Sequence, residues 1–251
     1  MTIPLKHTII YGPVNSRRLG SSLGINILGR SKKQCSFNCV YCQYGWTTDI
    51  PSEDAWDQAP GPDAVLTALE DALRRLPKPP QYITFSGNGE PTLHPAFPEI
   101  VDRVLDTRNR FSPDSKVAVL SNSSTITRPK VQRALSRLDV RIMKLDAGTQ
   151  ETFHRFNQNV IGLSLEEVVA GLQSMGDVTI QALFAKGPAG NFSEPEVQAW
   201  INRLKSIAPT SVQVYTLARG YPSDAISPLS REELESIGEA LKQEGIPGKV
   251  Y

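Results

Sequence analysis

Three cysteines are the residues of this 251-residue chain with the clearest capacity for chemistry. They are the only cysteines in the sequence, and they lie together in the segment Cys35-Ser-Phe-Asn-Cys39-Val-Tyr-Cys42. Thiolates are soft ligands, and several thiolates on one short loop suit a soft metal ion or an iron–sulfur cluster. A zinc site made from protein alone would need a fourth ligand to complete its tetrahedron. A cubane cluster held by three cysteines instead leaves one iron open to another ligand.

The spacing Cys-x3-Cys-x2-Cys, with the aromatic Tyr41 directly before the last cysteine, resembles the signature of the radical S-adenosylmethionine superfamily. The resemblance implies that Cys35, Cys39 and Cys42 hold a [4Fe–4S] cluster whose open iron binds the amino and carboxylate groups of S-adenosylmethionine. It also implies that one electron cleaves this cofactor to methionine and a 5′-deoxyadenosyl radical, which abstracts hydrogen from a substrate. Tyr41 is then expected to pack near the adenine.

A zinc-binding or redox-active thiol cluster without radical chemistry is the alternative interpretation of the same cysteines. The second cysteine pair of a zinc ribbon is missing, and the histidines at positions 7, 94 and 154 lie far from the cysteines in sequence. The spacing and its context therefore favour the iron–sulfur interpretation.

A glycine-rich segment, Ser86-Gly-Asn-Gly-Glu90, follows the second expected strand. Glycines let a backbone approach a ligand closely, and a carboxylate can bind the ammonium of an amino acid. The segment resembles the Gly-Gly-Glu motif of the superfamily, although Asn88 stands where the common form has glycine. The resemblance implies that Gly87, Gly89 and Glu90 hold the methionine end of the cofactor. An ordinary glycine turn is the alternative.

Polar residues also follow or lie on later strands. Ser121 and Asn122 could bind the ribose hydroxyls or the carboxylate of the cofactor, or could simply form a turn or helix cap. By resemblance Asp146 is a cofactor or substrate contact, whereas a structural pair with Lys144 is the alternative, because a buried charge is costly unless it is matched. Gln181 is expected either to point toward the cofactor or to be paired within the sheet.

Apolar periodicity predicts six strands that alternate with six helices. The expected strands are 23–27, 82–85, 116–120, 141–145, 178–184 and 212–215, and the expected helices are 63–76, 97–107, 129–138, 165–175, 194–207 and 231–243. Asp63 is expected to cap the first helix, and residues 11–20 and 43–62 are expected to be loops. Regular alternation of this kind is typical of parallel strands joined by right-handed helical crossovers.

Six units are too few for a closed eight-unit barrel, so we predict an α/β fold built as a partial (β/α)6 TIM-like barrel of parallel strands. The superfamily resemblance implies the same core. In β/α barrels the chemistry lies on the loops at the carboxyl ends of the strands. The cysteine loop, the glycine-rich segment and the polar strand ends should therefore meet at one edge of the sheet. Tyr215 ends the last expected strand, and Arg219, in the loop after it, could meet an anionic substrate.

Length and composition are consistent with a single domain over residues 1–251. The resemblance implies that this domain is a radical S-adenosylmethionine core with an N-terminal extension of about residues 1–22 and a short C-terminal tail. The net charge of +1 gives no global field that would favour nucleic acid or an anionic membrane. No apolar run is long enough to span a bilayer, and the first residues lack the pattern of a signal peptide. Three clustered cysteines do not make a disulfide framework, so we expect a reducing, cytoplasmic setting.

Basic residues surround the cysteine loop in sequence: Arg17, Arg18, Arg30, Lys32 and Lys33. They could be an ordinary solvated surface. They could equally dock an acidic electron donor such as flavodoxin or ferredoxin by charge complementarity, or bind a phosphate-bearing substrate, including tRNA.

Residues 12–20, 35–45 and 86–94 also resemble the wyosine-synthesis-like Fe–S oxidoreductase subgroup of the superfamily. Archaeal wyosine synthases carry extra cysteines for a second cluster, and this chain has none. Its near-minimal core is similar to that of glycyl-radical activating enzymes as well. The substrate could therefore be a tRNA base, a peptide or protein, or a small molecule. A glycyl-radical or peptide-modifying activase and a non-enzymatic iron–sulfur or metal-binding protein are the alternatives.

Overall fold

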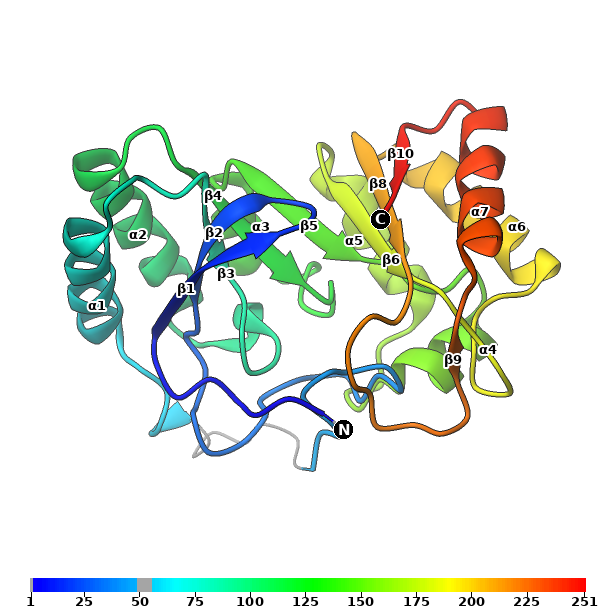
Figure 1. Cartoon of the computed structure of the whole chain (residues 1–251), viewed down its shortest axis with the longest axis horizontal. Helices are drawn as coiled ribbons and strands as arrows, with labels where there is room; N and C mark the ends of the chain where they lie inside the picture. Colours follow the sequence, from blue (N-terminus) through cyan, green and yellow to red (C-terminus); the bar gives the residue numbers. More distant parts are fainter. Residues whose placement is uncertain (1, 49–55) are drawn as a thin grey trace.

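The computed structural model describes residues 2–48 and 56–251. Its main sheet has eight strands in the order β1-β2-β3-β4-β5-β6-β8-β10, curved into an open arc with helices along its outer side (Figure 1). The neighbours from β2 to β10 are parallel, and β1 is antiparallel to β2. The predicted α/β partial barrel is confirmed. The strands are β1 (Ile10–Ser16), β2 (Gly20–Ile25), β3 (Tyr82–Phe85), β4 (Lys116–Ser121), β5 (Val140–Lys144), β6 (Thr179–Leu183), β8 (Ser211–Tyr215) and β10 (Gly248–Val250).

Six strand–helix units follow one another, as the sequence predicts. The helices that close them are α1 (Pro62–Arg75), α2 (Phe97–Phe111), α3 (Pro129–Ser136), α5 (Leu165–Met175), α6 (Glu194–Ile207) and α7 (Arg231–Gln243). Smaller elements lie in the connections: η2 (Pro91–Leu93), α4 (Gln150–Thr152), the π-helical turn η3 (Phe153–Asn157), and the two-stranded pair of β7 (Ala185–Lys186) and β9 (Ser227–Pro228). Helices α5 and α7 both begin with a capping box, Ser164 with Glu167 and Ser230 with Glu233, which satisfies free amides of the first turn.

The N-terminal part of the sheet differs from the sequence-based expectation. Residues 11–20, expected as a loop, are mostly β1, and the segment expected as an extension supplies β1 and part of β2 to the main sheet. The turn-forming pair Gly12 and Pro13 lies where the register between β1 and β2 shifts, so it marks a bulge and not a loop. Because β1 is an edge strand, a proline there removes no ladder hydrogen bond that the sheet needs.

Two further expectations need correction, and one falls partly outside the described residues. Gly61 caps α1 and Pro62 is its first residue, so Asp63 lies inside the first turn and is not the cap. The expected C-terminal tail contains β10, which extends the sheet beyond β8. Of the loop expected at 43–62, residues 49–55 lie outside the described residues, and the described parts are mainly turns and irregular backbone.

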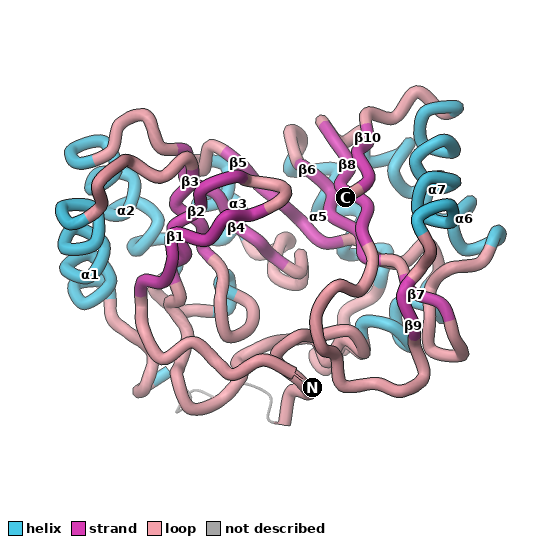
Figure 2. Tube along the Cα trace, in the orientation of Figure 1, coloured by secondary structure: helices cyan, strands magenta, loops and turns pink. Residues whose placement is uncertain are grey.

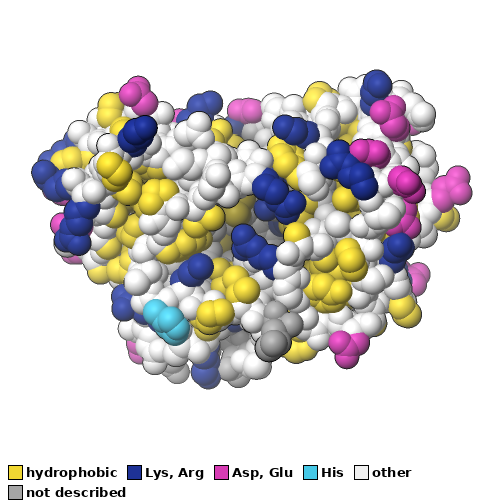
Figure 3. Space-filling model, viewed as in Figure 1, with side chains coloured by type: hydrophobic (Ala, Val, Ile, Leu, Met, Phe, Trp, Pro, Cys, Tyr) yellow, Lys and Arg dark blue, Asp and Glu magenta, His cyan; other side chains and the backbone are white. Residues whose placement is uncertain are grey.

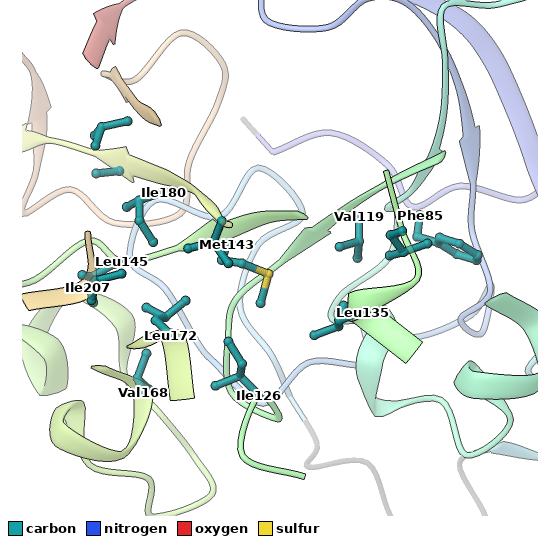
Figure 4. Packing of buried hydrophobic residues seen from close by; sticks show 14 of the residues in the cluster. Phe85, Val119, Ile126, Leu135, Met143, Leu145, Val168, Leu172, Ile180 and Ile207 are labelled. Atoms are coloured by element: carbon teal, nitrogen blue, oxygen red, sulfur yellow. The ribbon is translucent and has the colours of Figure 1, made fainter. Parts of the chain in front are cut away.

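The hydrophobic core lies between the outer side of the sheet and the helices. Figure 4 shows Val119, Met143 and Ile180 of the strands packed in one layer with Leu135 and Leu172 of the helices. Apolar residues at helical spacing, such as Val65, Leu69 and Leu73 of α1, bury one stripe of each helix against this layer.

The carboxyl ends of the parallel strands all lie at one edge of the sheet, which we call the carboxyl edge. Figure 2 shows much of the loop backbone gathered along this edge, together with the N-terminal segment. Among the described residues, no helix has the length and apolar character needed to cross a membrane.

Trp200 of α6 is the largest of the fully buried side chains, and it supports the end of β5. Its ring packs edge-on against Phe184, and its Nε1 donates to the carbonyl of Leu145 at 2.9 Å. We expect Trp200→Ala to lower the free energy of unfolding by about 3–5 kcal/mol in urea titrations, because it leaves a large cavity and an unpaired carbonyl.

Trp46→Ala is the matched control, since Trp46 is 41% exposed. Its effect should stay within about 0.5 kcal/mol, as for other surface substitutions. Equal losses for the two variants would contradict the packing described for Trp200.

Candidate functional site

The cysteine loop follows β2 and lies at the carboxyl edge, as predicted. All three cysteines are free; Cys35 and Cys39 are buried and Cys42 is half-buried. The amide of Cys42 donates to the carbonyl of Cys39 at 3.1 Å, so the last two cysteines share a tight turn. Burial raises the pKa of Cys35 to about 12 and that of Cys39 to about 11. In the metal-free loop these thiols stay protonated at neutral pH, and binding as thiolates must release their protons.

The donor set fits an iron–sulfur cluster. Three soft sulfur donors come from one loop, and two of them already accept hydrogen bonds from amides: Asn122 Nδ2 lies 3.6 Å from Cys35 Sγ, and Asn157 Nδ2 lies 3.6 Å from Cys39 Sγ. Such N–H donors stabilise the negative charge of cluster-bound thiolates. Within residues 2–48 and 56–251, no group of three or more His, Cys, Asp or Glu side chains is arranged around a single point that could hold a metal ion.

Backbone hydrogen bonds hold the cysteine loop on two sides. On one side Gln34 pairs with the glycine-rich segment. The backbone amide of Gln34 donates to the backbone carbonyl of Asn88 at 2.9 Å, and the backbone amide of Glu90 donates to the backbone carbonyl of Gln34 at 2.9 Å. On the other side the amide of Val40 donates to the carbonyl of Phe156 at 3.0 Å. The loop is therefore fixed between the ends of two other strand connections.

The glycines of the Gly-Asn-Gly-Glu segment allow two loops to meet. A Cβ on Gly89 would lie 1.7 Å from the carbonyl oxygen of Gln34, and a Cβ on Gly87 would lie 2.5 Å from Oδ1 of Asn26. Their φ angles of +146° and +138° are also rarely adopted by other residues. The close approach is thus to the chain's own backbone and side chains near the cysteines, and contact of these two glycines with the cofactor stays a prediction.

Asn88 departs from the superfamily motif, and the structure gives it a role. Its side chain is fully buried; its Oδ1 accepts from the amide of Lys6 at 2.7 Å, and its Nδ2 donates to the carbonyls of Lys6 and Gly29 at 2.8 and 2.9 Å. Asn88 therefore fastens the N-terminal segment to the two loops of the site.

Glu90, Ser121 and Asn122 are brought together, as the sequence predicts for strand ends at one edge. Oε1 of the buried Glu90 accepts from Ser121 Oγ at 3.0 Å and from the amide and hydroxyl of Thr92, while Oε2 accepts from the amide of Asn122 at 2.5 Å. Burial raises the pKa of Glu90, and the hydrogen bonds from Thr92, Asn122 and Ser121 oppose that rise. Because Oε2 accepts one hydrogen bond from the described residues, it keeps the capacity to accept another, such as one from an ammonium group.

Asp146 is the centre of a second buried polar group. Its Oδ1 lies 2.7 Å from Lys144 Nζ and accepts from the amide of Leu183 at 2.8 Å. Its Oδ2 accepts from Tyr41 Oη at 2.5 Å and from Asn157 Nδ2 at 2.9 Å. The structural Lys144–Asp146 pair is thus present, and the carboxylate also holds Tyr41 beside the cysteines. Burial lowers the pKa of Lys144, but the charges of Asp146 and Tyr215 and the hydrogen bonds to both together outweigh this, so the net pKa is raised.

A polar row crosses the inner side of the arc. Lys144, Gln181, Gln213 and Lys249 are in register on β5, β6, β8 and β10. Gln181 Nε2 donates to Gln213 Oε1 at 2.9 Å, and the hydroxyl of Tyr215 lies 3.1 Å from Lys144 Nζ. Gln181 is therefore paired within the sheet. Gln213 and Lys249 were not identified from the sequence, although polar residues at alternate positions of buried strands signal such a row.

The five basic residues near the cysteines do not form one solvated surface. Lys33 is buried, and its Nζ donates to the carbonyl of Gly45 at 2.8 Å. Arg18 lies over the ring of Tyr215, 4.4 Å from its centroid, whereas Arg17, Arg30 and Lys32 are exposed. In the view of Figure 3, Lys and Arg side chains gather around the middle of the face, and Asp and Glu lie towards its rim.

Arg219 closes onto the cysteine loop from the connection after β8, since its Nη1 donates to Gln43 Oε1 at 2.7 Å. Two surface cavities, of about 480 and 540 Å³, lie away from the cysteines, one beside α6 and one between β1 and α1. Burial and hydrogen bonding, not cavity size, therefore identify the site.

The sequence pattern of the radical SAM superfamily matches residues 32–184, more than half of the chain, including all three cysteines and the glycine-rich segment. This chain belongs to the radical SAM superfamily. The superfamily uses a [4Fe–4S] cluster and S-adenosylmethionine, which are therefore the cofactors of this chain. This superfamily membership confirms the resemblance seen in the sequence.

Curated relatives carry the label UPF0026 protein. One from Helicobacter pylori (strain J99 / ATCC 700824) is 32% identical over 90% of this chain and 71% of its own length, and one from Synechocystis sp. (slr1464) is 30% identical over 85% of this chain and 77% of its own length. Among solved structures, a radical SAM methyltransferase from Sphaerobacter thermophilus superposes with a TM-score of 0.68 at 15% identity, covering 92% of this chain and 65% of its own. The structure of TYW1 with a lysine-pyruvate adduct superposes with a TM-score of 0.62 at 14% identity, covering 90% and 75%. These structural similarities establish the fold.

Gly89 offers a direct test of the contact between the two loops. We expect Gly89→Ala to displace the cysteine loop, because its Cβ would collide with the Gln34 carbonyl and its φ of +146° disfavours a side chain. Anaerobic reconstitution of the variant should retain clearly less iron per chain than the unchanged protein.

Gly61→Ala is the control, because a Cβ at Gly61 meets no atom within 4 Å. This variant should load iron normally. Full iron loading in Gly89→Ala would show that the two loops do not depend on this close approach.

Proposed function

We propose that this chain is a radical S-adenosylmethionine enzyme that abstracts hydrogen from a substrate bound over the inner side of the arc. Cys35, Cys39 and Cys42 would hold the cluster, which would supply one electron for the reductive cleavage of S-adenosylmethionine and so allow hydrogen abstraction from the substrate. The observation that supports the proposal most is the placement of three free cysteines on one loop, fixed beside the buried carboxylate of Glu90.

The side chains of the site have distinct roles in this proposal. Cys35, Cys39 and Cys42 hold the cluster. Oε2 of Glu90 accepts from the ammonium of the methionine moiety, while the bonds from Ser121 and Asn122 keep its carboxylate in place. Asp146 accepts a hydrogen bond from the hydroxyl of Tyr41 and so keeps the tyrosine ring beside the cysteine loop, where it can pack against the adenine.

The substrate would lie over the polar row of the inner side. Buried polar side chains such as Gln181 and Gln213 favour ligands that can hydrogen-bond, and Lys144 adds a cation near the centre. These groups favour a polar substrate, and a tRNA base, a peptide or a small molecule each satisfy that condition. A glycyl-radical activase would differ from these by leaving a lasting radical on a partner protein.

The cluster is the first feature to test. Anaerobic reconstitution should give about four irons per chain, and reductant with S-adenosylmethionine should give 5′-deoxyadenosine and methionine in equal amounts. Cys39→Ser should lose most of the iron and all cofactor cleavage, because one of three ligands is replaced by a poor one. Iron quantification and chromatography of the products measure both. A fully loaded cluster that never cleaves the cofactor would rule out the enzyme.

Glu90→Gln separates cofactor binding from cluster binding within the same experiment. The amide keeps the size of the side chain but loses the charge that attracts ammonium, so iron should be retained while the Kd for S-adenosylmethionine rises about tenfold, or about 1.4 kcal/mol. An unchanged Kd would remove Glu90 from this role.

An acidic electron donor such as flavodoxin or ferredoxin, in a reducing cytoplasmic compartment, belongs to the same proposal. Arg30 is exposed in the segment between β2 and the cysteine loop, and Arg17 is exposed in the β1–β2 turn, next to Arg18, whose guanidinium lies over the ring of Tyr215. We expect the rate of cluster reduction by reduced flavodoxin to fall with ionic strength and to fall severalfold in an Arg17→Glu/Arg30→Glu variant, because complementary charge speeds association.

Lys116→Glu is the control, since Lys116 is exposed at the start of β4, away from the carboxyl edge. Its rate should match that of the unchanged protein. Equal rates in stopped-flow absorbance for the two charge-reversal variants would exclude docking through Arg17 and Arg30.

A further inference from the structure

Asn157 is a buried amide whose two donors have unusual partners. The residue is 2% exposed, and its Nδ2 donates to Cys39 Sγ at 3.6 Å and to Asp146 Oδ2 at 2.9 Å. Its Oδ1 is buried and accepts no hydrogen bond from the described residues. A buried acceptor without a partner destabilises a fold, so an apolar side chain would serve better at a purely structural position. We therefore take the hydrogen bonds donated by Nδ2 of Asn157 as the reason for an amide at this position.

The backbone around Asn157 is shaped to place that amide. Asn157 ends the π-helical turn η3, a conformation that is rare and is frequently found at functional sites, and Gln158 follows in the left-handed region at φ +44°. The same segment pairs with the cysteine loop: the amide of Asn38 donates to the carbonyl of Asn157 at 3.1 Å, and the amide of Val160 donates to the carbonyl of Ser36 at 3.0 Å. The donor and the sulfur are thus fixed relative to each other by backbone contacts on both sides.

Asn122 makes the corresponding contact from the other side of the loop. Its Nδ2 lies 3.6 Å from Cys35 Sγ and donates to Ser36 Oγ at 3.0 Å, and its Oδ1 accepts from the amide of Ser124 at 2.9 Å. Two asparagines from different strand connections therefore donate to two different cysteines.

From this geometry we infer that Asn122 and Asn157 set the reduction potential of the cluster by donating N–H···S hydrogen bonds to two of its ligands. The inference rests on the proposed function, because it takes the cysteines as cluster ligands. Adding an electron increases the negative charge on the cluster and its thiolates, and hydrogen-bond donors stabilise that charge. Loss of either donor makes the cluster harder to reduce. Both residues act through cysteines and are positioning residues, not catalytic ones.

Asn157→Leu and Asn122→Leu remove the donors while keeping similar side-chain size. EPR-monitored redox titration of the reconstituted protein should show, for each variant, a more negative midpoint potential. At a fixed solution potential the ratio of reduced to oxidised cluster should fall about threefold, the effect of one modest hydrogen bond. The double variant should show the two shifts added.

Asn38→Leu is the matched control in the same loop. Asn38 makes side-chain hydrogen bonds to Thr47 and Gln158 but none to a cysteine, so its loss should leave the midpoint of any retained cluster unchanged. Full iron in both donor variants with an unshifted midpoint would overturn the inference, as would an equal shift in Asn38→Leu.

If the leucine variants retain no iron, pulsed EPR of the unchanged protein labelled with ¹⁵N-asparagine decides the question. Coupling of the reduced cluster to side-chain ¹⁵N supports the inference, and no coupling overturns it. These readouts are separate from the proposed function, which fails instead if the unchanged protein holds no cluster or does not cleave S-adenosylmethionine.

Discussion

Backbone hydrogen bonds on both sides of the cysteine loop are the constraint on which the rest of the site depends. A loop outside regular secondary structure loses much conformational entropy when it is fixed, and its thiols alone cannot offset that loss before a cluster binds. Here Gln34 pairs with the glycine-rich segment, and Val40 and Val160 connect the loop to the turn after β5. The three cysteines are therefore held in one loop geometry by the fold itself, which would lower the entropic cost of binding a cluster there.

The second constraint is the pairing of the buried Asp146 carboxylate. Asp146 lies under the site with four donors around it, and a buried carboxylate is tolerated only in such surroundings. The same four bonds tie together β5, β6, Tyr41 and Asn157. The carboxylate therefore connects the sheet, the aromatic ring of Tyr41 and the Asn157 amide that donates to Cys39. A substitution at Asp146 would remove a hydrogen-bond acceptor from all three.

The sequence predicts those parts of this fold that depend on local patterns. The six strand–helix units follow from periodicity, and the three candidate cluster ligands are identified by their spacing. Strand β1 could not be predicted, because Gly12 and Pro13 read as turn formers and their bulge exists only through pairing with β2. β10 is three residues long and is stabilised by its place beside β8. The sequence predicts that Gly89 lets the backbone come close to a ligand. In the structure the group that lies close to Gly89 is the backbone of Gln34, which only the tertiary structure reveals. Asn157 lies in a stretch without periodicity, and its role depends on contacts more than a hundred residues away.

The contact between Asn88 and the N-terminal segment has a practical consequence. Residues 2–9 lie outside the helices and strands, yet Lys6 supplies two of the three backbone partners of a fully buried amide. Cutting the chain back past Lys6 would leave that amide, which is part of the glycine-rich segment, with unpaired polar atoms. An expression tag joined there, or a proteolytic cut a few residues further on, would therefore act on the cofactor loop even though neither change touches a cysteine.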